Sequence, residues 1–262
     1  MVEPVPPIAR SDSSPEARLS TFTTKYSEMF KALGLLDYEK QIVASHPRYL
    51  YEEDLLIFLY AGINISDLFL APHDDTELET WFYNDANKDY AYEYHKTFLK
   101  MLNSIDTPQS HWLLKTPLHT FYLDTLLRHY PTASLIMSHR RLDEVLPSSV
   151  RIFIAATMDY FNNSSTDTVT NKKKVVERGL KFIDIAIDRL LKFRHANQHA
   201  RTFDLLYEDL MTKPIDTVRR IYEYFGLTWS EDFEQAMIKW LHENPQGKQG
   251  RNTYTLEEFG LT

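Results

Sequence analysis

The chain has 262 residues, of which 43% are hydrophobic and 25% are charged, and such a chain can bury a substantial core in one large domain. Its formal net charge of -8 argues against a nucleic-acid-binding protein, which needs a broad basic surface. The absence of cysteine excludes disulfide scaffolds, cysteine-ligated zinc and cysteine nucleophiles, and it favours a reducing, cytoplasmic location. No apolar run reaches the roughly 20 residues of a membrane span, and no signal-peptide core precedes residue 30.

The first 110 residues predict an arm followed by helices. Residues 1–16 are rich in proline and serine, which predicts a surface arm. Apolar residues then recur at helical spacing over 16–44, with a break near Gly34, over 52–69, and over 78–102. Glu52 and Glu53 head the second of these segments, where carboxylates favour the helix dipole. The aromatic residues of the third segment either line an acceptor pocket or fill the core: Trp81, Tyr90, Tyr94 and Phe98.

From residue 111 onward, strand and helix patterns alternate. Residues 111–115 predict a short buried strand, after which Thr116 as N-cap and Pro117 at the first helical position predict a helix running to about residue 130. Residues 133–138 and 202–207 predict two further strands. The helices expected after them cover about 143–160, 173–194, 214–225 and 231–242.

Short apolar strands between longer helices are typical of parallel βαβ units and predict an α/β fold. Ligands of such sheets bind beyond the carboxyl ends of the strands, where this chain has Lys115, Arg140 and Tyr207. The planar fork of Arg140 suits a phosphate, and the helix that follows it carries Ser148. The structural alternatives are a solvated charge for Lys115 and a basic helix cap for Arg140.

Two more features are candidates for chemistry. His119 falls in the first turn of a helix, where the macrodipole disfavours imidazolium, so a neutral ring could accept a proton from an alcohol. A purely structural histidine is the alternative. Residues 244–251 form a basic loop with glycines, in which Lys248, Gly250 and Arg251 could wrap a phosphate. An ordinary solvated loop would have the same composition.

Taken in order, the segments 112–119, 138–148, 207–210, 218–226 and 244–260 resemble sulfotransferases that use 3'-phosphoadenosine 5'-phosphosulfate (PAPS). The resemblance is closest to the large sulfotransferase-like family distinct from the cytosolic phenol and steroid enzymes. It implies in-line transfer of a sulfuryl group from PAPS to a hydroxyl or amine of a small-molecule or glycan acceptor, without a metal, and release of 3',5'-ADP. The implied fold is a P-loop NTPase-like α/β domain over 1–262, with a parallel sheet flanked by helices.

The resemblance also implies roles for particular residues. Lys115 would stabilise charge on the leaving 5'-phosphate, and His119 would be the base. Residues 17–110 would form the acceptor side, and 111–262 would carry the α/β part with the 3'-phosphate site. That donor site would comprise Arg140, Ser148, Tyr207, Lys248, Gly250 and Arg251.

One family feature is missing from this sequence. Family members have an apolar strand and a loop of the type Gly-x-x-Arg-Ser/Thr-Gly-Thr that holds the 5'-phosphosulfate, and the chain contains no such segment. We therefore expect an N-terminally truncated sulfotransferase without its first strand and phosphate loop. The alternative is a pseudoenzyme or interaction protein with a residual 3',5'-ADP half-site. A kinase is less favoured, because no magnesium-binding or lysine-bearing phosphate loop is visible.

Loss of a central strand has an energetic consequence. Each buried backbone group left without a hydrogen bond costs roughly 1–3 kcal/mol, and several such losses rival the roughly 5–15 kcal/mol that stabilise a whole domain. We therefore expect the 262-residue chain to be marginally stable or prone to aggregation, and to have no transferase activity.

Overall fold

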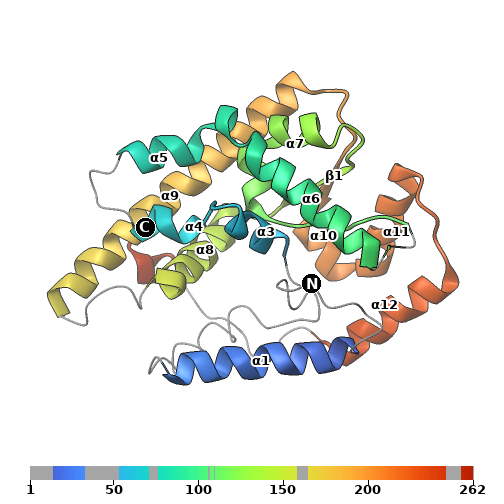
Figure 1. Ribbon diagram of the computed structural model, residues 1–262, viewed down its shortest axis with the longest axis horizontal. Helices are drawn as coiled ribbons and strands as arrows, with labels where there is room; N and C mark the ends of the chain where they lie inside the picture. Colours follow the sequence, from blue (N-terminus) through green and yellow to red (C-terminus); the bar gives the residue numbers. More distant parts are fainter. Residues whose placement is uncertain are drawn as a thin grey trace. The chain divides into compact units, whose positions relative to one another are not determined.

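The computed structural model in Figure 1 describes most of the chain, including all of its helices and strands discussed below. The described residues are 14–32, 53–70, 76–105, 107–108, 110–157, 165–245 and 255–261. They belong to two compact units: one contains Met1–Pro131 and Ser149–Phe193, and the other contains Thr132–Ser148 and Arg194–Thr262. None of the described helices is both long enough and apolar enough to cross a membrane.

The second unit is built on two parallel strands. Strand β1 (Leu135–His139) pairs with β2 (Thr202–Leu206), and the register runs from Leu135 opposite Thr202 to His139 opposite Leu206. A parallel pair needs a long crossover connection, which here contains α8 (Leu142–Thr157) and α9 (Ser165–Ala196). Strand, helices and parallel strand make the predicted α/β arrangement, and both strands lie within two residues of the predicted positions.

Helices follow β2 and cover part of it. They are α10 (Tyr207–Thr212), α11 (Pro214–Phe225) and α12 (Glu231–Glu243), with a 3-10 turn, η5 (Glu257–Phe259), near the end. Leu205 on β2 is buried against Ile221 and Phe225 of α11. Helix α11 begins with proline and ends at Gly226, whose φ of 66° provides the left-handed C-cap that glycine adopts without strain.

The first unit is helical. Its elements, besides parts of α8 and α9, are α1 (Pro15–Ala32), α3 (Leu55–Tyr60), α4 (Ile65–Leu70), α5 (Thr76–Tyr83), η2 (Asp85–Asn87), α6 (Asp89–Ile105), η3 (Pro117–Phe121) and α7 (Leu123–His129). Helix α6 packs against α3 and α7. Aromatic rings fill much of this core. Phe69 is stacked on Phe153 with 4.2 Å between ring centroids, and Phe121 meets Phe182 at 4.5 Å with the rings tilted by 52°.

The structure corrects the predicted strand at 111–115. These residues belong to no strand, and among the described residues the sheet has two strands, not three. Leu113 is 80% exposed, so this apolar stretch does not line a buried ladder. The apolar composition was compatible with a strand, but a strand also needs a neighbour to pair with, and local sequence does not reveal one.

Several predicted helices end differently. The segment expected over 78–102 is α5, η2 and α6, because the Asn84 side chain accepts a hydrogen bond from the Ala86 N–H at 3.0 Å and caps the short η2 turn. The helix expected over 117–130 is η3 followed by α7, with a break at Tyr122. Helix α1 already begins at Pro15, inside the predicted arm. The rest of the arm, residues 1–13, lies outside the described residues, as does the predicted break near Gly34.

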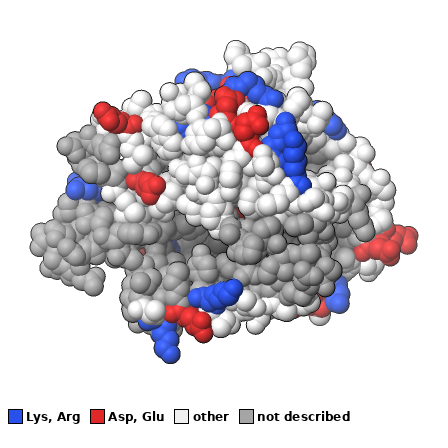
Figure 2. Space-filling view, viewed as in Figure 1, with Lys and Arg blue, Asp and Glu red and all other residues white. Residues whose placement is uncertain are grey.

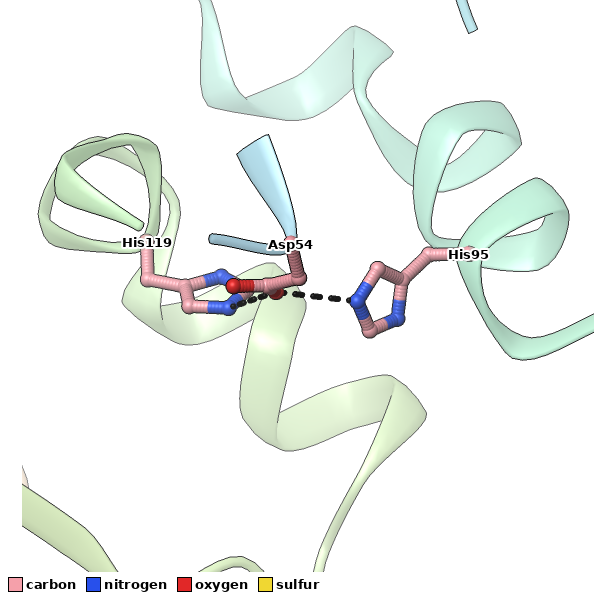
Figure 3. A group of neighbouring side chains, drawn as sticks. All are labelled: Asp54, His95 and His119. Carbon is pink, nitrogen blue, oxygen red and sulfur yellow. Dashed lines mark hydrogen bonds and ion pairs between the residues drawn. The ribbon is translucent and has the colours of Figure 1, made fainter. Parts of the chain in front are cut away.

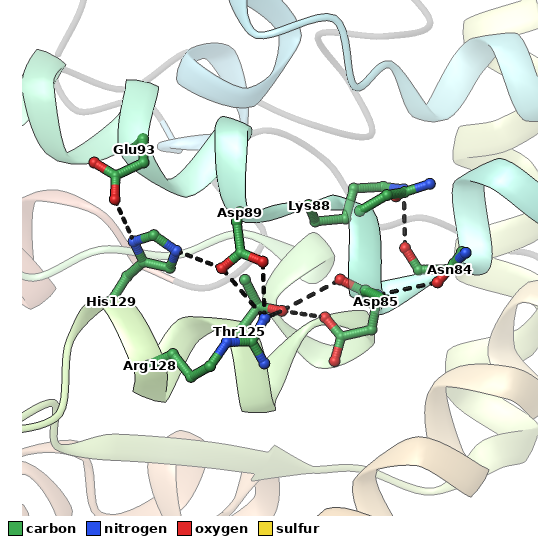
Figure 4. Close-up of polar contacts among 10 residues, drawn as sticks. Asn84, Asp85, Lys88, Asp89, Glu93, Thr125, Arg128 and His129 are labelled. Atoms are coloured by element: carbon green, nitrogen blue, oxygen red, sulfur yellow. Dashed lines mark hydrogen bonds and ion pairs between the residues drawn. The ribbon is translucent and has the colours of Figure 1, made fainter.

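A buried lysine binds oxygens at the end of α5 and in the segment between α5 and α6. Lys88 is 0% exposed, and its Nζ donates to the carbonyls of Trp81 at 2.5 Å and Asn84 at 3.1 Å and to the side-chain oxygen of Asn87. The ammonium also lies 4.2 Å from the centroid of the Trp81 ring. Burial lowers the pKa of Lys88 from 10.5 to about 8. Figure 4 shows this lysine beside Asn84 and Asp85.

This lysine should give the protein a characteristic alkaline stability profile. Between pH 8 and 10.5 the unfolded chain holds the Lys88 proton and the folded chain releases it, so the free energy of unfolding rises with pH. The gain relative to Lys88→Met is expected to approach about 3–4 kcal/mol, at about 1.4 kcal/mol per pKa unit, and denaturant melts at several pH values would measure it. Lys181→Met, which removes a lysine that is 53% exposed, is the control and should keep the wild-type profile. Parallel profiles for wild type and Lys88→Met would contradict the assignment.

Candidate functional site

The segment Thr116–Pro117 fixes where His119 lies. Thr116 has extended backbone and its Oγ1 accepts a hydrogen bond from the Leu118 N–H at 3.3 Å, while Pro117 occupies the first position of η3. His119 therefore lies in the first turn after a capped start, as the sequence predicts. Its side chain is 17% exposed.

Both ring nitrogens of His119 have protein partners. Nε2 lies 3.0 Å from Oδ2 of Asp54, the residue just before α3, and Nδ1 lies 3.0 Å from the hydroxyl of Tyr92 on α6. The His119 and Phe58 rings are nearly perpendicular, with 5.5 Å between ring centroids. The histidine is thus held by groups that are 65 and 27 residues away in sequence.

The same carboxylate oxygen binds a second histidine. Nε2 of His95 on α6 lies 3.0 Å from Oδ2 of Asp54, and Nδ1 of His95 lies 2.7 Å from the hydroxyl of Tyr130. The side chains of His95 and Asp54 are only 1% and 3% exposed. Figure 3 shows Asp54 between the two imidazole rings. These contacts link five side chains in a row, and we call them the Asp54 network: Tyr92, His119, Asp54, His95 and Tyr130.

The protonation states of the Asp54 network follow from its surroundings. Burial by itself raises the pKa of Asp54, but the hydrogen bonds from His119 and His95 outweigh it and hold that pKa well below its usual value of 3.8. Burial raises the pKa of Tyr92 and of Tyr130 far above neutral pH. The network therefore contains one carboxylate and two tyrosine hydroxyls that keep their protons.

Lys115, the other residue predicted to take part in catalysis, has an acidic partner next to Asp54 in the sequence. Its Nζ forms an ion pair with Oε1 of Glu53, and the two side chains are 68% and 19% exposed. Two consecutive acids at the start of α3 thus bind Lys115 and His119: Glu53 binds the lysine and Asp54 the histidine. Glu53 was expected to act as a helix cap, and Asp54 was not singled out.

One signal could have identified part of this network. Tyr92, His95, Phe98 and Leu99 are all buried, and their spacing puts them on one face of α6. A histidine on the buried face of an amphipathic helix needs a polar partner. The spacing could therefore have flagged His95, although it does not identify Asp54 as the partner.

The two histidines and the aspartate could also be considered as metal ligands, since one atom from each lies within 4.8 Å of the others. A metal would take the lone pairs of both Nε2 atoms, so each Nδ1 would have to carry a proton and donate it to a tyrosine oxygen. The hydroxyl proton of the fully buried Tyr92 would then lose its acceptor, at a cost of about 1–3 kcal/mol. Hydrogen bonding alone satisfies both hydroxyls, and we assign the group as a hydrogen-bonded network.

The donor-side candidates lie in the second unit, at the ends of its strands. His139 and Leu206 are register partners, so the residues that follow them, Arg140 and Tyr207, leave the sheet next to each other. The Arg140 guanidinium carbon lies 4.3 Å from the centroid of the Tyr207 ring. Nε of Arg140 donates to Glu144 at 2.7 Å.

The remaining donor-site candidates divide into described and undescribed residues. Ser148 lies on α8, one turn after Glu144 and therefore on the same helix face. Lys248, Gly250 and Arg251 lie outside the described residues. Lys115 and His119 belong to the first unit, whereas Arg140, Ser148 and Tyr207 belong to the second.

Basic side chains elsewhere are accompanied by acids. In the described part of the chain, Arg128 and His129 share Asp89, Arg141 pairs with Asp143, and Arg194 pairs with Asp204. Figure 4 shows the first of these groups, and Figure 2 shows lysine and arginine side chains close to acidic ones. Such pairing offsets the positive charge of these side chains locally.

Replacing Asp54 should destabilise the protein strongly and in a pH-dependent way. Asp54→Asn removes a buried charge on which two histidines depend, and we expect a loss of about 3–5 kcal/mol at pH 7. Because the folded-state pKa is lowered, this contribution is present above the unfolded value of 3.8 and is lost as the pH falls below it. Denaturant melts at pH 7 and at about pH 3 would measure both effects.

Asp89→Asn provides the control for this experiment, because Asp89 also binds a histidine but is 51% exposed. We expect it to cost no more than about 1 kcal/mol. An Asp54→Asn variant as stable as Asp89→Asn would show that the buried carboxylate is not the anchor of this region.

Comparison with known proteins identifies the family. A family model described as "Sulfotransferase family" matches residues 41–231. The omega-hydroxy-beta-dihydromenaquinone-9 sulfotransferase Stf3 of Mycobacterium bovis and that of Mycobacterium tuberculosis are each 24% identical to the chain over 158 residues, which is 57% of this chain and 37% of the relative.

Solved structures give the same result for the fold. The crystal structure of sulfotransferase STF9 from Mycobacterium avium superposes with a TM-score of 0.69 and 27% identity, covering 88% of this chain and 59% of that one. Sulfotransferase STF1 from Mycobacterium tuberculosis gives a TM-score of 0.65 and 23% identity, covering 90% and 62%. The chain thus spans less than two thirds of the length of each of these relatives. With a family model matching most of its length, the chain belongs to the sulfotransferase family.

Proposed function

We propose that this sulfotransferase chain carries the 3'-phosphate half of a PAPS site and the acceptor-side groups for sulfuryl transfer to a hydroxyl. The observation that carries the proposal is the contact of Arg140 with Tyr207, 4.3 Å from guanidinium carbon to ring centroid, beyond the carboxyl ends of two parallel strands. Ligands of α/β sheets bind at such strand ends. A guanidinium is the group best suited to a phosphate.

Within this donor half-site, each residue has a distinct task. Arg140 is oriented by Glu144 through its Nε and by the ring of Tyr207, so its fork loses little further entropy when it binds a phosphate. Ser148 adds a hydroxyl from α8, and Tyr207 offers an aromatic surface near the adenine. Lys248, Gly250 and Arg251 would complete the enclosure of the 3'-phosphate.

The acceptor-side groups supply the chemistry. Sulfuryl transfer resembles phosphoryl transfer, in which the protein mainly aligns an in-line attack and stabilises developing charge. Lys115, which is 68% exposed, would neutralise the leaving 5'-phosphate. His119 would take the proton of the acceptor, a contribution of typically 10²–10⁴-fold.

A small molecule with a hydroxyl group is the acceptor class that we propose. Support comes from the names of the Stf3 relatives, which describe sulfotransferases for an omega-hydroxy compound. A glycan hydroxyl is the second candidate acceptor. The chemistry at the base is the same for both, since either loses a proton from oxygen as the new bond to sulfur forms.

The half-site can be tested by calorimetric titration of the chain with 3',5'-ADP, with 5'-AMP as the ligand that lacks the 3'-phosphate. We expect 3',5'-ADP to bind and 5'-AMP to bind at least tenfold more weakly. Arg140→Ala should lower the affinity for 3',5'-ADP at least tenfold, which is about 1.4 kcal/mol, because it removes a charge-assisted contact.

Arg141→Ala is the matched control, since it removes a neighbouring arginine that pairs with Asp143 and is 76% exposed. It should leave the affinity for 3',5'-ADP within about twofold of wild type. A folded chain that binds neither nucleotide, or one in which both arginine variants behave alike, would contradict the donor half-site.

Turnover is a separate question from binding. The sequence contains no Gly-x-x-Arg-Ser/Thr-Gly-Thr loop to hold the 5'-phosphosulfate, so we propose that the 262-residue chain binds 3',5'-ADP without transferring sulfate. Incubation with radiolabelled PAPS and a panel of alcohols would detect transfer. Labelled product above the level seen with His119→Gln would contradict this proposal and show that other residues hold the 5'-phosphosulfate.

A further inference from the structure

The positions of the protons in the Asp54 network follow from its contacts. An ionised carboxylate can only accept hydrogen bonds. Oδ2 of Asp54 lies 3.0 Å from Nε2 of both His119 and His95, so both Nε2 atoms must carry protons. In a neutral imidazole the other nitrogen is then an acceptor, and the hydroxyls of Tyr92 and Tyr130 must donate to the two Nδ1 atoms.

Burial makes this arrangement costly to change. Tyr92 and His95 are 0% exposed, so water cannot replace a partner that turns away. Switching either ring to its Nδ1–H tautomer would place the Nε2 lone pair and a carboxylate oxygen face to face. Both N–H donors converge on Oδ2, while Oδ1 of Asp54 is buried and has no hydrogen-bond partner among the described residues. The carboxylate is therefore held through one oxygen by two donors from different elements.

We propose that Asp54 is a positioning residue that fixes His119 as its Nε2–H tautomer, so that Nδ1, next to the hydroxyl of Tyr92, is the atom that accepts the proton of the sulfate acceptor. His95 and Tyr130 hold Asp54 in place from the other side. This role rests on the proposed function of His119 as the base. It assigns a function to Asp54, His95 and Tyr92 beyond packing.

These groups account for the proton that the sulfate acceptor loses during transfer. As the acceptor oxygen forms its bond to sulfur and the bond from sulfur to the 5'-phosphate oxygen breaks, the acceptor O–H bond breaks and its proton goes to Nδ1 of His119. For this the Tyr92 hydroxyl turns about its C–O bond and frees the Nδ1 lone pair; it then accepts from Nδ1–H, and its own proton has no acceptor until the imidazolium gives up the transferred proton. The resulting imidazolium keeps Nε2–H directed at the Asp54 carboxylate, which stabilises the positive charge and remains ionised.

The tautomers can be observed directly, without turnover, by long-range ¹H–¹⁵N NMR of the chain labelled with ¹⁵N-histidine at pH 8. His119→Gln and His95→Gln would assign the two sets of signals among the ten histidines. We expect both rings to show a protonated Nε2 and an unprotonated Nδ1. An Nδ1–H tautomer for His119 in the wild-type protein would overturn the proposal.

Two variants test whether Asp54 and Tyr92 determine the protonation of the two histidine rings. The amide of Asp54→Asn is uncharged: if its oxygen lies where Oδ2 was, the Nε2–H signals of both rings should shift, and if its NH₂ lies there, both rings should change to the Nδ1–H tautomer. Tyr92→Phe, which is less disruptive, should keep Nε2 of His119 protonated and shift the Nδ1 resonance towards that of a nitrogen without a hydrogen bond. Unchanged His119 and His95 signals in a folded Asp54→Asn, or an unchanged Nδ1 resonance in Tyr92→Phe, would overturn the role of these residues.

A matched aspartate variant, added zinc and a nucleotide titration serve as controls. Asp89→Asn, which alters the aspartate bound to His129, should leave the signals of His95 and His119 in place. A metal at Asp54, His95 and His119 would overturn the proposal, and it would appear as loss of both Nε2–H signals with one equivalent of zinc. Titration of the same samples with 3',5'-ADP tests the proposed function independently, since the donor half-site contains none of these residues.

Discussion

The first unit depends on one buried carboxylate. Asp54 is only 3% exposed in its side chain, so its charge persists only because two histidines donate to it. Those donors come from α6 and η3, and Asp54 itself precedes α3. The carboxylate thus fixes three elements relative to one another. Its neighbour Glu53 binds Lys115, and therefore the two groups proposed to act on the acceptor side are held by consecutive residues.

In the second unit, strand register has a comparable effect. His139 and Leu206 pair across the two parallel strands, and this pairing brings Arg140 and Tyr207 into contact although they are far apart in sequence. An arginine that lies over a tyrosine ring and is bound by Glu144 has few orientations left. Backbone hydrogen bonds of the sheet thereby bring the guanidinium to the carboxyl ends of the strands, the place where ligands of α/β sheets bind.

Two polar groups lie buried in the aromatic core of the first unit, Lys88 and Asp54. The buried Lys88 satisfies three oxygens between α5 and α6 but loses hydration, which lowers its pKa to about 8. The Asp54 network meets the same difficulty with charge-assisted hydrogen bonds and tyrosine hydroxyls. In both places a polar group is retained inside an aromatic core, and it has enough partners that burial does not expel it. The difference is that His119, the proposed base, remains partly exposed, at 17%.

The sequence by itself determined the family resemblance, the α/β class, both described strands and the capped start that places His119 after Thr116 and Pro117. These features depend on neighbouring residues, since capping, periodicity and strand composition are local. Only the tertiary structure decided that residues 111–115 form no strand, and that Asp54 joins His95 and His119 across 41 and 65 residues. Pairing partners and buried hydrogen bonds are chosen by chain segments that meet only on folding, and no local pattern encodes which segments those are.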